Sequence, residues 1–437
     1  MIDSLYTNIK RTNILRKWSY EKVYFFIMMI YLGMANGYTQ VLCFPPSEGI
    51  VSFIVPFILT FILIYRNPHA FSNNKIFYKI IGLVLLWVFL QVIKYEHFNA
   101  MNMFLFYNFC LAYVIAKVYG KYAMNLYDKD LTILCIISLI VWLIYNVAPS
   151  PTTSFFQKFF MEEKGTATAN AFLVGLASSK DILGYRNLGF GQEPGFFASF
   201  IILGMFFNLI INKYKVLNRN FIIQLITLIT TQSTTGYASF LIIVLLIVAN
   251  GKASRYITIA LVAILLPTII ALPFVGDKIK DTQSNQSTID NVVWNADYIE
   301  QNGREGVFVP QRFDGFALEL MNFEHDPILG YGVKGEKTSY VSTNLSPLIS
   351  CSNGNIKVFS RFGLIFGLFF FFVLYHSGLY LCDNNKKSGW IFLLMYLFLS
   401  MSYDISTIPL LLSFWFMLPF FKGTIKTSNK NSLANSL

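Results

Sequence analysis

The sequence predicts an all-α polytopic integral membrane protein with about 12 transmembrane helices. Of its 437 residues, 55% are hydrophobic and only 13% are charged, and the mean hydropathy is +0.54, whereas soluble chains carry about 25% charged residues. Apolar runs of roughly 20 residues, the length that crosses a bilayer, recur along the chain. The net charge of +11 is spread among the short loops between these runs, so we expect no nucleic-acid partner.

The apolar runs predict seven segments. We expect a cytoplasmic N-terminal tail (1–21), five transmembrane helices (22–148), an outer loop (149–194), the middle helices (195–275), a large outer loop (276–355), the last three helices (356–421) and a cytoplasmic tail (422–437). The individual spans are predicted near residues 22–43, 49–65, 76–95, 101–119, 131–148, 195–212, 219–233, 234–250, 255–275, 356–381, 388–402 and 405–421. The polar hinge Thr230–Gly236 lies inside what could be one broken helix pair, so eleven and thirteen spans are the alternatives. The first run lacks a small-residue cleavage site, which predicts a first span and not a removed signal.

Charge in the loops predicts the orientation of the chain. With the N-terminus inside, 21 of the 34 Lys and Arg residues fall on the inner side, in short segments. Because Lys and Arg in short loops favour the cytoplasmic side, we expect both termini to be cytoplasmic and both long loops to be extracytoplasmic. Loops of that length are usually functional or disordered, so we expect any chemistry at the outer face.

The end of the first long loop runs directly into an apolar helix. Arg186 and Glu193 precede Pro194, which suits the first turn of a helix because its missing N–H would have had no partner there. The free N–H groups and the positive dipole end of this helix, beside Arg186, predict a seat for an anion. Phosphate is the obvious candidate.

The second long loop contains a predicted helix. Apolar residues recur at helical spacing from Gln311 to Phe323, and Asp326-Pro327 ends the helix. Arg312 lies in its first turn and, taken alone, would be a solvated cation. Arg186 supplies a second outer guanidinium, and two guanidiniums can grip a diphosphate through bidentate hydrogen bonds.

A glycine-rich turn follows, in which Gly330, Gly332 and Gly335 have GxGxxG spacing. No predicted strand precedes it and it faces away from cytoplasmic dinucleotides, so we reject a dinucleotide-binding interpretation. At a membrane surface, such a turn is instead expected to hold a lipid-borne phosphate with its backbone.

Arg361 lies about one and a half turns into the next span. A cation at that depth either snorkels to the headgroups or faces a partner inside the bundle, and Asp404 is a candidate partner. Six residues predicted on the outer side could act as acids or bases: Glu193, Asp314, Glu319, Glu324, His325 and Asp326. For any one of them alone, we expect a surface or helix-capping role. The sequence has no zinc-peptidase, serine-hydrolase or phosphate-loop ATPase motif on the outer side, and its five cysteines show no metal-ligand spacing.

In their order and outer placement, these motifs resemble the O-antigen polymerase and ligase family, and more closely its Wzy-type oligosaccharide repeat-unit polymerases. The resemblance is carried by Arg186-x-x-Gly189-Phe190-x-x-Glu193-Pro194-x-x-x-Ala198, by Thr231-Gln232-Ser233-Thr234-Thr235-Gly236, by Arg312 followed by Asp326–Gly332, and by Ser352-Asn353-Gly354 with Arg361–Gly367. Together they cover roughly residues 180–370, and the first 150 residues match only in hydropathy.

The resemblance implies a GT-C-like membrane glycosyltransferase, without metal or other cofactor, that acts on undecaprenyl-diphosphate-linked oligosaccharide at the outer face of the bacterial cytoplasmic (inner) membrane. It implies that Arg186 and Arg312 bind the diphosphate and stabilise it as it leaves, and that Glu193 orients Arg186 or acts as general base. The helix dipole favours the charged form of Glu193, and so the orienting role. Expected substrate contacts are Arg361, Gly330, Gly332, Asn353 and His325. Membrane lipid, a chain-length regulator and a flippase are the further partners considered.

Two alternatives stay open. In ligases of this family, which transfer finished O-antigen to a lipid core, a His stands before the closing span, where this chain has Ser352-Asn353-Gly354. This difference favours the polymerase. A flippase or transporter of the same lipid-linked glycan would line a midplane cavity with charge, whereas this chain keeps its charge at the outer rim and shows no inverted repeat of broken helices. O-antigen and capsular polysaccharide are equally open as products.

Overall fold

A computed structural model describes residues 19–31, 49–71, 75–97, 100–159, 167–171, 174–181, 183–191, 193–250, 292–294, 296, 298, 310, 312–332, 338–349, 351, 354–400 and 408–417. The helices of the first half are α2 (Tyr20–Tyr31), α4 (Gly49–Arg66), the 3₁₀ turn η2 (Pro68–Phe71), α5 (Lys75–Tyr95), α6 (Ala100–Tyr119), α7 (Tyr122–Val147) and α8 (Pro149–Phe159). After strands β1 (Ala167–Ala171), β2 (Val174–Asp181) and β3 (Gly184–Asn187) come α9 (Pro194–Ile211), α10 (Arg219–Thr231), α11 (Thr234–Asn250), α15 (Arg312–His325), α16 (Tyr340–Asn344), α17 (Gly354–Leu381), α18 (Lys386–Ser400) and α19 (Pro409–Trp415).

Four of the described helices are long and apolar enough to cross a membrane. They cover Phe77–Tyr95, Tyr122–Val147, Pro194–Ile211 and Gly354–Leu381. Shorter apolar helices cover Pro56–Arg66, Leu105–Tyr119 and Thr234–Asn250. The protein is therefore a mostly helical membrane protein, as predicted, and the count of 12 spans stays a prediction.

The predicted spans that fall within the described residues coincide with helices. The polar hinge separates α10 from α11, because Gln232 adopts a left-handed backbone conformation (φ 50°, ψ 38°) that ends α10. The predicted helix of the second long loop is confirmed as α15, which ends at His325, just before Asp326-Pro327. The predicted span 255–275 lies outside the described residues.

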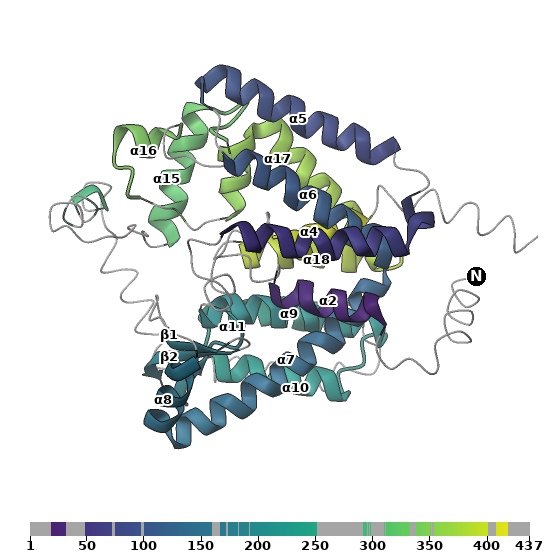
Figure 1. The fold of residues 1–437 in the computed structure, drawn as a ribbon, viewed down its shortest axis with the longest axis vertical. Helices are drawn as coiled ribbons and strands as arrows, with labels where there is room; N and C mark the ends of the chain where they lie inside the picture. Colours follow the sequence, from purple (N-terminus) through teal and green to yellow (C-terminus); the bar gives the residue numbers. More distant parts are fainter. Residues whose placement is uncertain are drawn as a thin grey trace, which may run out of the picture.

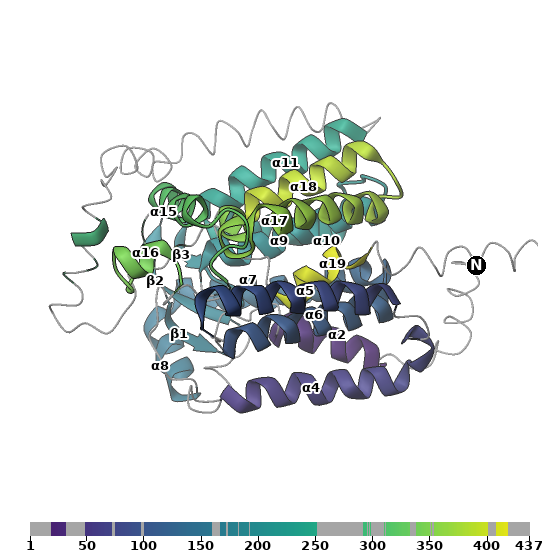
Figure 2. The ribbon, with the colours of Figure 1, turned by 90° about the horizontal axis from the view of Figure 1, so that it is seen from above.

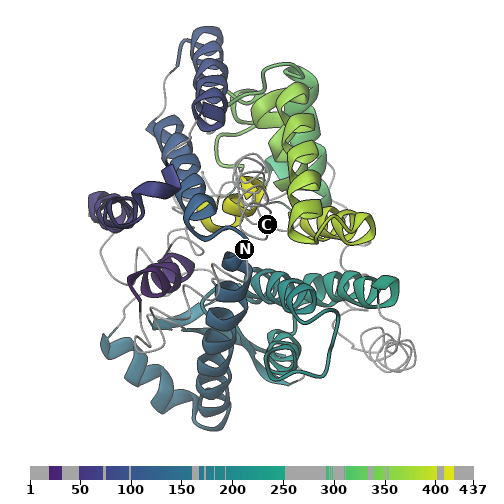
Figure 3. The ribbon, with the colours of Figure 1, turned by 90° about the vertical axis from the view of Figure 1, so that its right-hand side faces the viewer.

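Helix α9 is the central helix of the bundle. Every residue from Pro194 to Leu209 is buried, and α9 packs against α7, α10 and α11. Helix α5, by contrast, exposes Leu86, Phe89 and Ile93, as expected of a lipid-facing helix. Figure 3 looks along the bundle and shows α2 and α4 (purple) on one side of it and α17 and α18 (green to yellow) on the other.

Helix ends that are predicted to share one side of the membrane lie together. On the predicted inner side, Lys121 forms an ion pair with Asp383, and the Asn385 Nδ2 donates to Asn250 Oδ1 at 2.7 Å. The elements of the two predicted outer loops gather at the opposite end: Figures 1 and 2 both show β1, β2, α8, α15 and α16 at the left end of the bundle.

The first predicted outer loop is more ordered than a connecting segment, and it departs from the predicted all-α fold. It contains α8 and an antiparallel sheet with strand order β1-β2-β3. These strands were not predicted because Ala167–Ala171 and Val174–Asp181 consist mostly of small and polar residues without a clear alternation of apolar side chains.

Candidate functional site

Arg186, the third residue of β3, binds the hinge between α10 and α11. Its Nε donates to the Thr231 carbonyl at 3.3 Å and its Nη2 to the Gln232 carbonyl at 2.9 Å. In return, the Gln232 side chain accepts from the backbone N–H of Leu183 at 2.9 Å and donates to the Gly184 carbonyl at 3.4 Å. Carbonyls at the C-terminal end of a helix carry partial negative charge, which the guanidinium offsets. The Arg186 segment and the Thr231–Gly236 segment are thus one bonded unit.

The strands that carry Arg186 are fixed to one face of α7. Trp142 Nε1 donates to the Tyr185 carbonyl at 2.5 Å, and the Asn146 Oδ1 accepts from the Tyr185 N–H at 2.8 Å. Tyr145 donates to the Ala177 carbonyl at 2.9 Å. Residues three and four apart share a helix face, so α7 presents these side chains together and positions Arg186 through the sheet.

Glu193 stands at the N-cap of α9, in front of Pro194. Its backbone is extended, and its exposed side chain makes no capping hydrogen bond. Its carbonyl accepts from the N–H groups of Phe196 and Phe197 at 3.1 Å and 3.2 Å. The predicted helix start is confirmed, but two of the N–H groups expected to meet an anion are engaged within the helix.

A second bonded unit joins the glycine-rich turn to α17, which is interrupted at Gly363 (φ 75°, ψ 174°). The N–H of Leu364 donates to the Pro327 carbonyl at 2.8 Å. The Tyr331 N–H donates to the Ser360 carbonyl at 2.8 Å, and the Gly332 N–H to the Arg361 carbonyl at 3.0 Å. The turn therefore supplies hydrogen bonds that the interrupted helix lacks.

The two predicted phosphate-binding glycines serve this docking instead. A Cβ on Gly330 would lie 2.4 Å from the backbone carbon of Arg361, and both Gly330 and Gly332 have positive φ. The Gly330 N–H donates to the Asp326 carbonyl at 3.2 Å, so the amides at residues 330–332 are all engaged within the protein. These three amides are therefore not available to hold a phosphate, which corrects the prediction for Gly330 and Gly332, while Gly335 lies outside the described residues.

Side chains of helix α5 also bind the glycine-rich turn. The Gln91 Nε2 donates to the carbonyls of Leu329 and Arg361 at 2.6 Å and 2.7 Å. Lys94 Nζ forms an ion pair with Asp326 at 2.6 Å, and Tyr95 donates to the same carboxylate. Asp326 is buried, so the predicted surface or capping role is wrong for its side chain.

Glu319 of α15 is also buried, at 2% exposure, contrary to its predicted surface role. It accepts hydrogen bonds from Ser360 Oγ at 2.5 Å, from Tyr331 at 3.3 Å and from Asn322 Nδ2 at 3.3 Å. The half-buried Arg361 lies close enough to Tyr331 for its charge to act on the hydroxyl. Burial and the Glu319 charge raise the pKa of Tyr331 well above its usual value, although the Arg361 charge lowers it. The predicted partner of Arg361, Asp404, lies outside the described residues, so its two predicted environments stay predictions.

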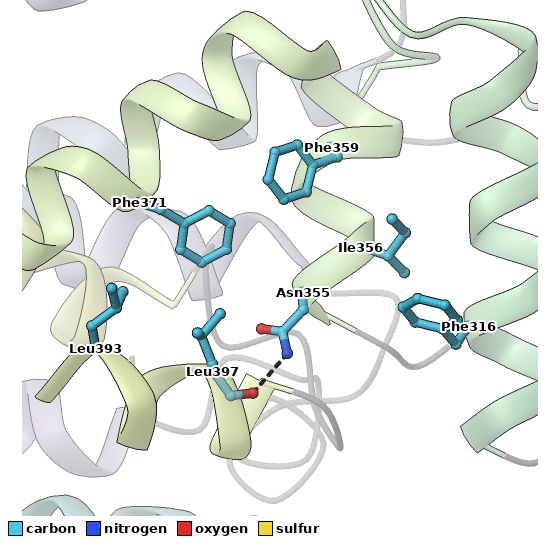
Figure 4. Close-up of a pocket in the computed structure, with 7 residues that line it drawn as sticks. All are labelled: Phe316, Asn355, Ile356, Phe359, Phe371, Leu393 and Leu397. Atoms are coloured by element: carbon cyan, nitrogen blue, oxygen red, sulfur yellow. Dashed lines mark hydrogen bonds between the residues drawn. The ribbon is translucent and has the colours of Figure 1, made fainter. Parts of the chain in front are cut away.

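An apolar pocket of about 320 Å³ lies between α15, α17 and α18. Figure 4 shows Phe316 of α15 beside Ile356 of α17, and the Asn355 amide turned toward the Leu397 carbonyl, 2.7 Å away. The lining residues are Phe316, Asn355, Ile356, Phe359, Phe371, Leu393 and Leu397. The pocket fits a hydrocarbon chain better than a sugar or a phosphate.

The predicted site residues thus fall in two units at one end of the bundle. In Figure 1, the sheet that carries Arg186 is at the lower left and α15 is at the upper left. Arg312 begins α15, although its side chain is outside the described set, as are Asn353 and Asp404. His325 is exposed at the end of α15, with its ring 5.2 Å from that of Tyr340.

No group of three or more His, Cys, Asp or Glu side chains in the described ranges could hold a metal ion. Comparison with known protein families gives no match, and comparison with curated proteins gives none either. The functional assignment therefore depends on the residues and their geometry.

Proposed function

We propose that this protein polymerises lipid-linked oligosaccharide repeat units at the outer face of the bacterial cytoplasmic membrane. The growing glycan moves from undecaprenyl diphosphate to the terminal sugar of a new lipid-linked repeat, and undecaprenyl diphosphate leaves. The enzyme is a metal-independent, GT-C-like glycosyltransferase with about 12 spans and both termini in the cytoplasm. Its product is an O-antigen or a capsular polysaccharide, and a flippase and a chain-length regulator are its proposed partners.

The observation that carries this proposal is the pairing of the motifs. The Arg186 segment is bonded to the Thr231–Gly236 hinge, and the Asp326–Gly332 turn is bonded to the segment around Arg361. Within each of these two pairs, the motifs are therefore neighbours in space although they are separated in the sequence. Both units lie at the end of the bundle that the charge distribution predicts to be extracytoplasmic.

The proposed roles follow the charge that develops during transfer. Negative charge builds on the diphosphate as the glycosidic bond breaks, and the guanidiniums of Arg186, Arg312 and Arg361 stabilise it. Glu193 orients Arg186, while Asn353 and His325 contact the substrate at the outer surface. Gly330 and Gly332 shape the turn that positions Arg361.

The apolar pocket supports a lipid-borne substrate. It lies on α15 and α17, the helices that carry Arg312 and Arg361. A prenyl chain in this pocket would bring its diphosphate toward the outer end of these helices, since isoprenoid carbon gains free energy by leaving water.

The experiment that tests this function is gel analysis of surface polysaccharide in a deletion strain. We expect a single repeat unit on the lipid core, and a full ladder when the wild-type protein is restored. Accumulation of undecaprenyl-linked polymer with no repeat on the core would identify a ligase instead. Accumulation of single lipid-linked repeats facing the cytoplasm would identify a flippase and overturn the assignment.

A further inference from the structure

Two aromatic side chains of the second predicted outer loop are exposed beside each other. Residues 292–294, 296 and 298 are helical, and Trp294 and Tyr298 lie one helical turn apart. Their rings are stacked, with centroids 5.5 Å apart and planes 23° apart. Trp294 is 63% exposed and Tyr298 is 46% exposed. Large rings favour burial, so an exposed stack of two is a candidate contact surface.

The opposite face of the same segment fixes it to the candidate site. Val292 and Ala296 are buried, in an apolar cluster with Leu318 of α15 and Val341 of α16. Helix positions two residues apart point about 200° away from each other. The burial of one face therefore directs the two aromatic rings outward. Because α15 begins at Arg312, the rings are attached to one of the helices that carry the proposed diphosphate-binding residues.

The stack lies beyond the end of the bundle that is predicted to be extracytoplasmic. In Figures 1 and 2, the short helical segment that contains residues 292–294 is at the far left, farther from the bundle than α16. Trp and Tyr are also common at the headgroup level of membrane proteins, close to the ends of the spans. A position beyond α16 instead places these rings in water, where the glycan of a lipid-linked substrate extends.

Sugar rings fit an exposed aromatic surface. One face of a pyranose ring presents C–H groups with partial positive charge, and the face of an aromatic ring is negative. Trp and Tyr are stiff side chains that offer a large contact area, so they lose little entropy on binding. In the sequence, Asn295 and Asp297 stand between Trp294 and Tyr298, and their side chains are of the types that form hydrogen bonds with sugar hydroxyls.

We propose that Trp294 and Tyr298 bind sugar rings of the glycan, as a subsite separate from the arginines proposed to bind the diphosphate. This inference rests on the proposed function, which brings a glycan to this side of the membrane. The subsite takes no part in bond formation. It retains the glycan near the site between transfers, so its loss should shorten the polysaccharide without abolishing it.

The test is the binding of two lipid-free oligosaccharides to the purified full-length protein. One is a single repeat unit and the other a fragment of several repeats, both prepared from the surface polysaccharide of the native strain. Trp294→Ala removes the more exposed ring, so we expect about tenfold weaker binding and an unchanged unfolding midpoint. Trp294→Phe keeps a ring and should restore most of the affinity.

The two oligosaccharides distinguish the source of the bound sugar. A loss for the longer fragment alone assigns the subsite to the growing chain, and a loss for both shows that it also takes the new repeat. In the complemented deletion strain, Trp294→Ala should shift the gel ladder toward fewer repeats.

The matched control is Trp390→Ala. Trp390 is also exposed, at 56%, and its ring centroid lies 4.7 Å from that of Tyr375. It belongs to the first turns of α18, however, on the predicted inner side. We expect unchanged affinity for both oligosaccharides.

The outcomes separate the two proposals. If Trp294→Ala binds both oligosaccharides as wild type does, the subsite is overturned, and the proposed function stands because the deletion strain decides it. If the wild-type protein binds neither oligosaccharide, the subsite is overturned as well. If the deletion strain keeps its full ladder, the proposed function falls, and this inference with it.

Two further measurements complete the test. Quenching of Trp294 fluorescence by brominated phospholipid in nanodiscs, taken as the difference between wild type and Trp294→Phe, would show that the ring contacts the membrane and would overturn the sugar subsite. If Trp294→Ala lowers the unfolding midpoint, the same binding comparison with Tyr298→Ala decides.

Discussion

The backbone N–H of Leu364 donates to the carbonyl of Pro327, 2.8 Å away, in a turn that precedes α17 in the sequence. In a regular helix this N–H would donate to Ser360, whose carbonyl here accepts from Tyr331. The glycine-rich turn thus takes part in the backbone hydrogen bonding of a predicted transmembrane helix. Any movement of α15 and its turn must therefore disturb the position of Arg361.

Gly363 permits this arrangement, so Gly363→Ala should displace the turn. A Cβ at this position would lie 1.8 Å from the Ile328 carbonyl oxygen, and its backbone angles belong almost exclusively to glycine. The backbone strain alone should cost about 1–3 kcal/mol. Thermal unfolding of the detergent-purified protein measures the loss.

The control for this variant is Gly82→Ala, in α5, where an added Cβ meets no atom within 4 Å. In an exposed helix interior, alanine should stabilise by about 1 kcal/mol. Equal unfolding temperatures of the two variants would contradict the close packing of the glycine-rich turn against Gly363.

Gln91→Leu should loosen the turn without leaving a large cavity. Gln91 uses both amide hydrogens on the carbonyls of Leu329 and Arg361. Each carbonyl keeps a second donor, Trp87 Nε1 at 3.3 Å for Leu329 and the Gly332 N–H at 3.0 Å for Arg361, so each lost hydrogen bond should cost about 0.5–1.5 kcal/mol. Gln91→Glu should lose more, because a carboxylate would face two carbonyl oxygens. Unfolding midpoints check this order, with Asn67→Ala as the control, since its amide donates to Leu63 in the preceding turn.

Hydropathy and turn residues predicted much of this fold. The helix boundaries around Pro194, the hinge at Gln232 and the end of α15 at His325 depend on local sequence, and all three are confirmed. The break at Gly363 was not predicted, because a glycine in an apolar run does not change the hydropathy.

The contacts between α5 and the glycine-rich turn could not be predicted from the sequence, for a different reason. Gln91 and Leu329 are 238 residues apart, and nothing in the sequence of α5 marks it as a neighbour of the glycine-rich turn. Asp326 was interpreted as a helix stop, which it is, but its ion pair with Lys94 requires a helix from the first 150 residues. Local patterns carry no information on such partners.

The buried Asp128 is a second test of the fold. Its carboxylate accepts from Asn208 at 3.0 Å, Asn220 at 2.7 Å and Gln224 at 2.9 Å, which ties α7 to α9 and α10. Asp128→Ala leaves the Asn208 and Asn220 amides without this acceptor, at about 1–3 kcal/mol for each buried donor. The Gln224 amide keeps Thr132 Oγ1 as an acceptor at 3.1 Å. Asp128→Asn should lose less, since one amide oxygen remains as an acceptor.

The control for Asp128 is Asp383→Asn, which removes the charge and keeps a residue that tolerates the left-handed backbone at this position (φ 52°). Asp383 pairs with Lys121, but its side chain is 85% exposed, so the loss of its charge should change stability by less than about 1 kcal/mol. If thermal unfolding places Asp128→Ala beside this control, the Asn208 and Asn220 amides have found other acceptors.

Arg186→Ala and Arg312→Ala should each abolish long polysaccharide chains while the protein stays in the membrane fraction. Arg186→Lys should also fail, because one ammonium cannot reproduce the Nε and Nη2 donors that meet the Thr231 and Gln232 carbonyls. The control is Lys180→Ala, an exposed cation of β2 whose Nζ lies 4.9 Å from the centre of the Tyr185 ring. It should leave the ladder intact. Unchanged chain length in both arginine-to-alanine variants would remove the diphosphate clamp from the proposed mechanism, because two guanidiniums that the reaction does not need cannot be stabilising its leaving group.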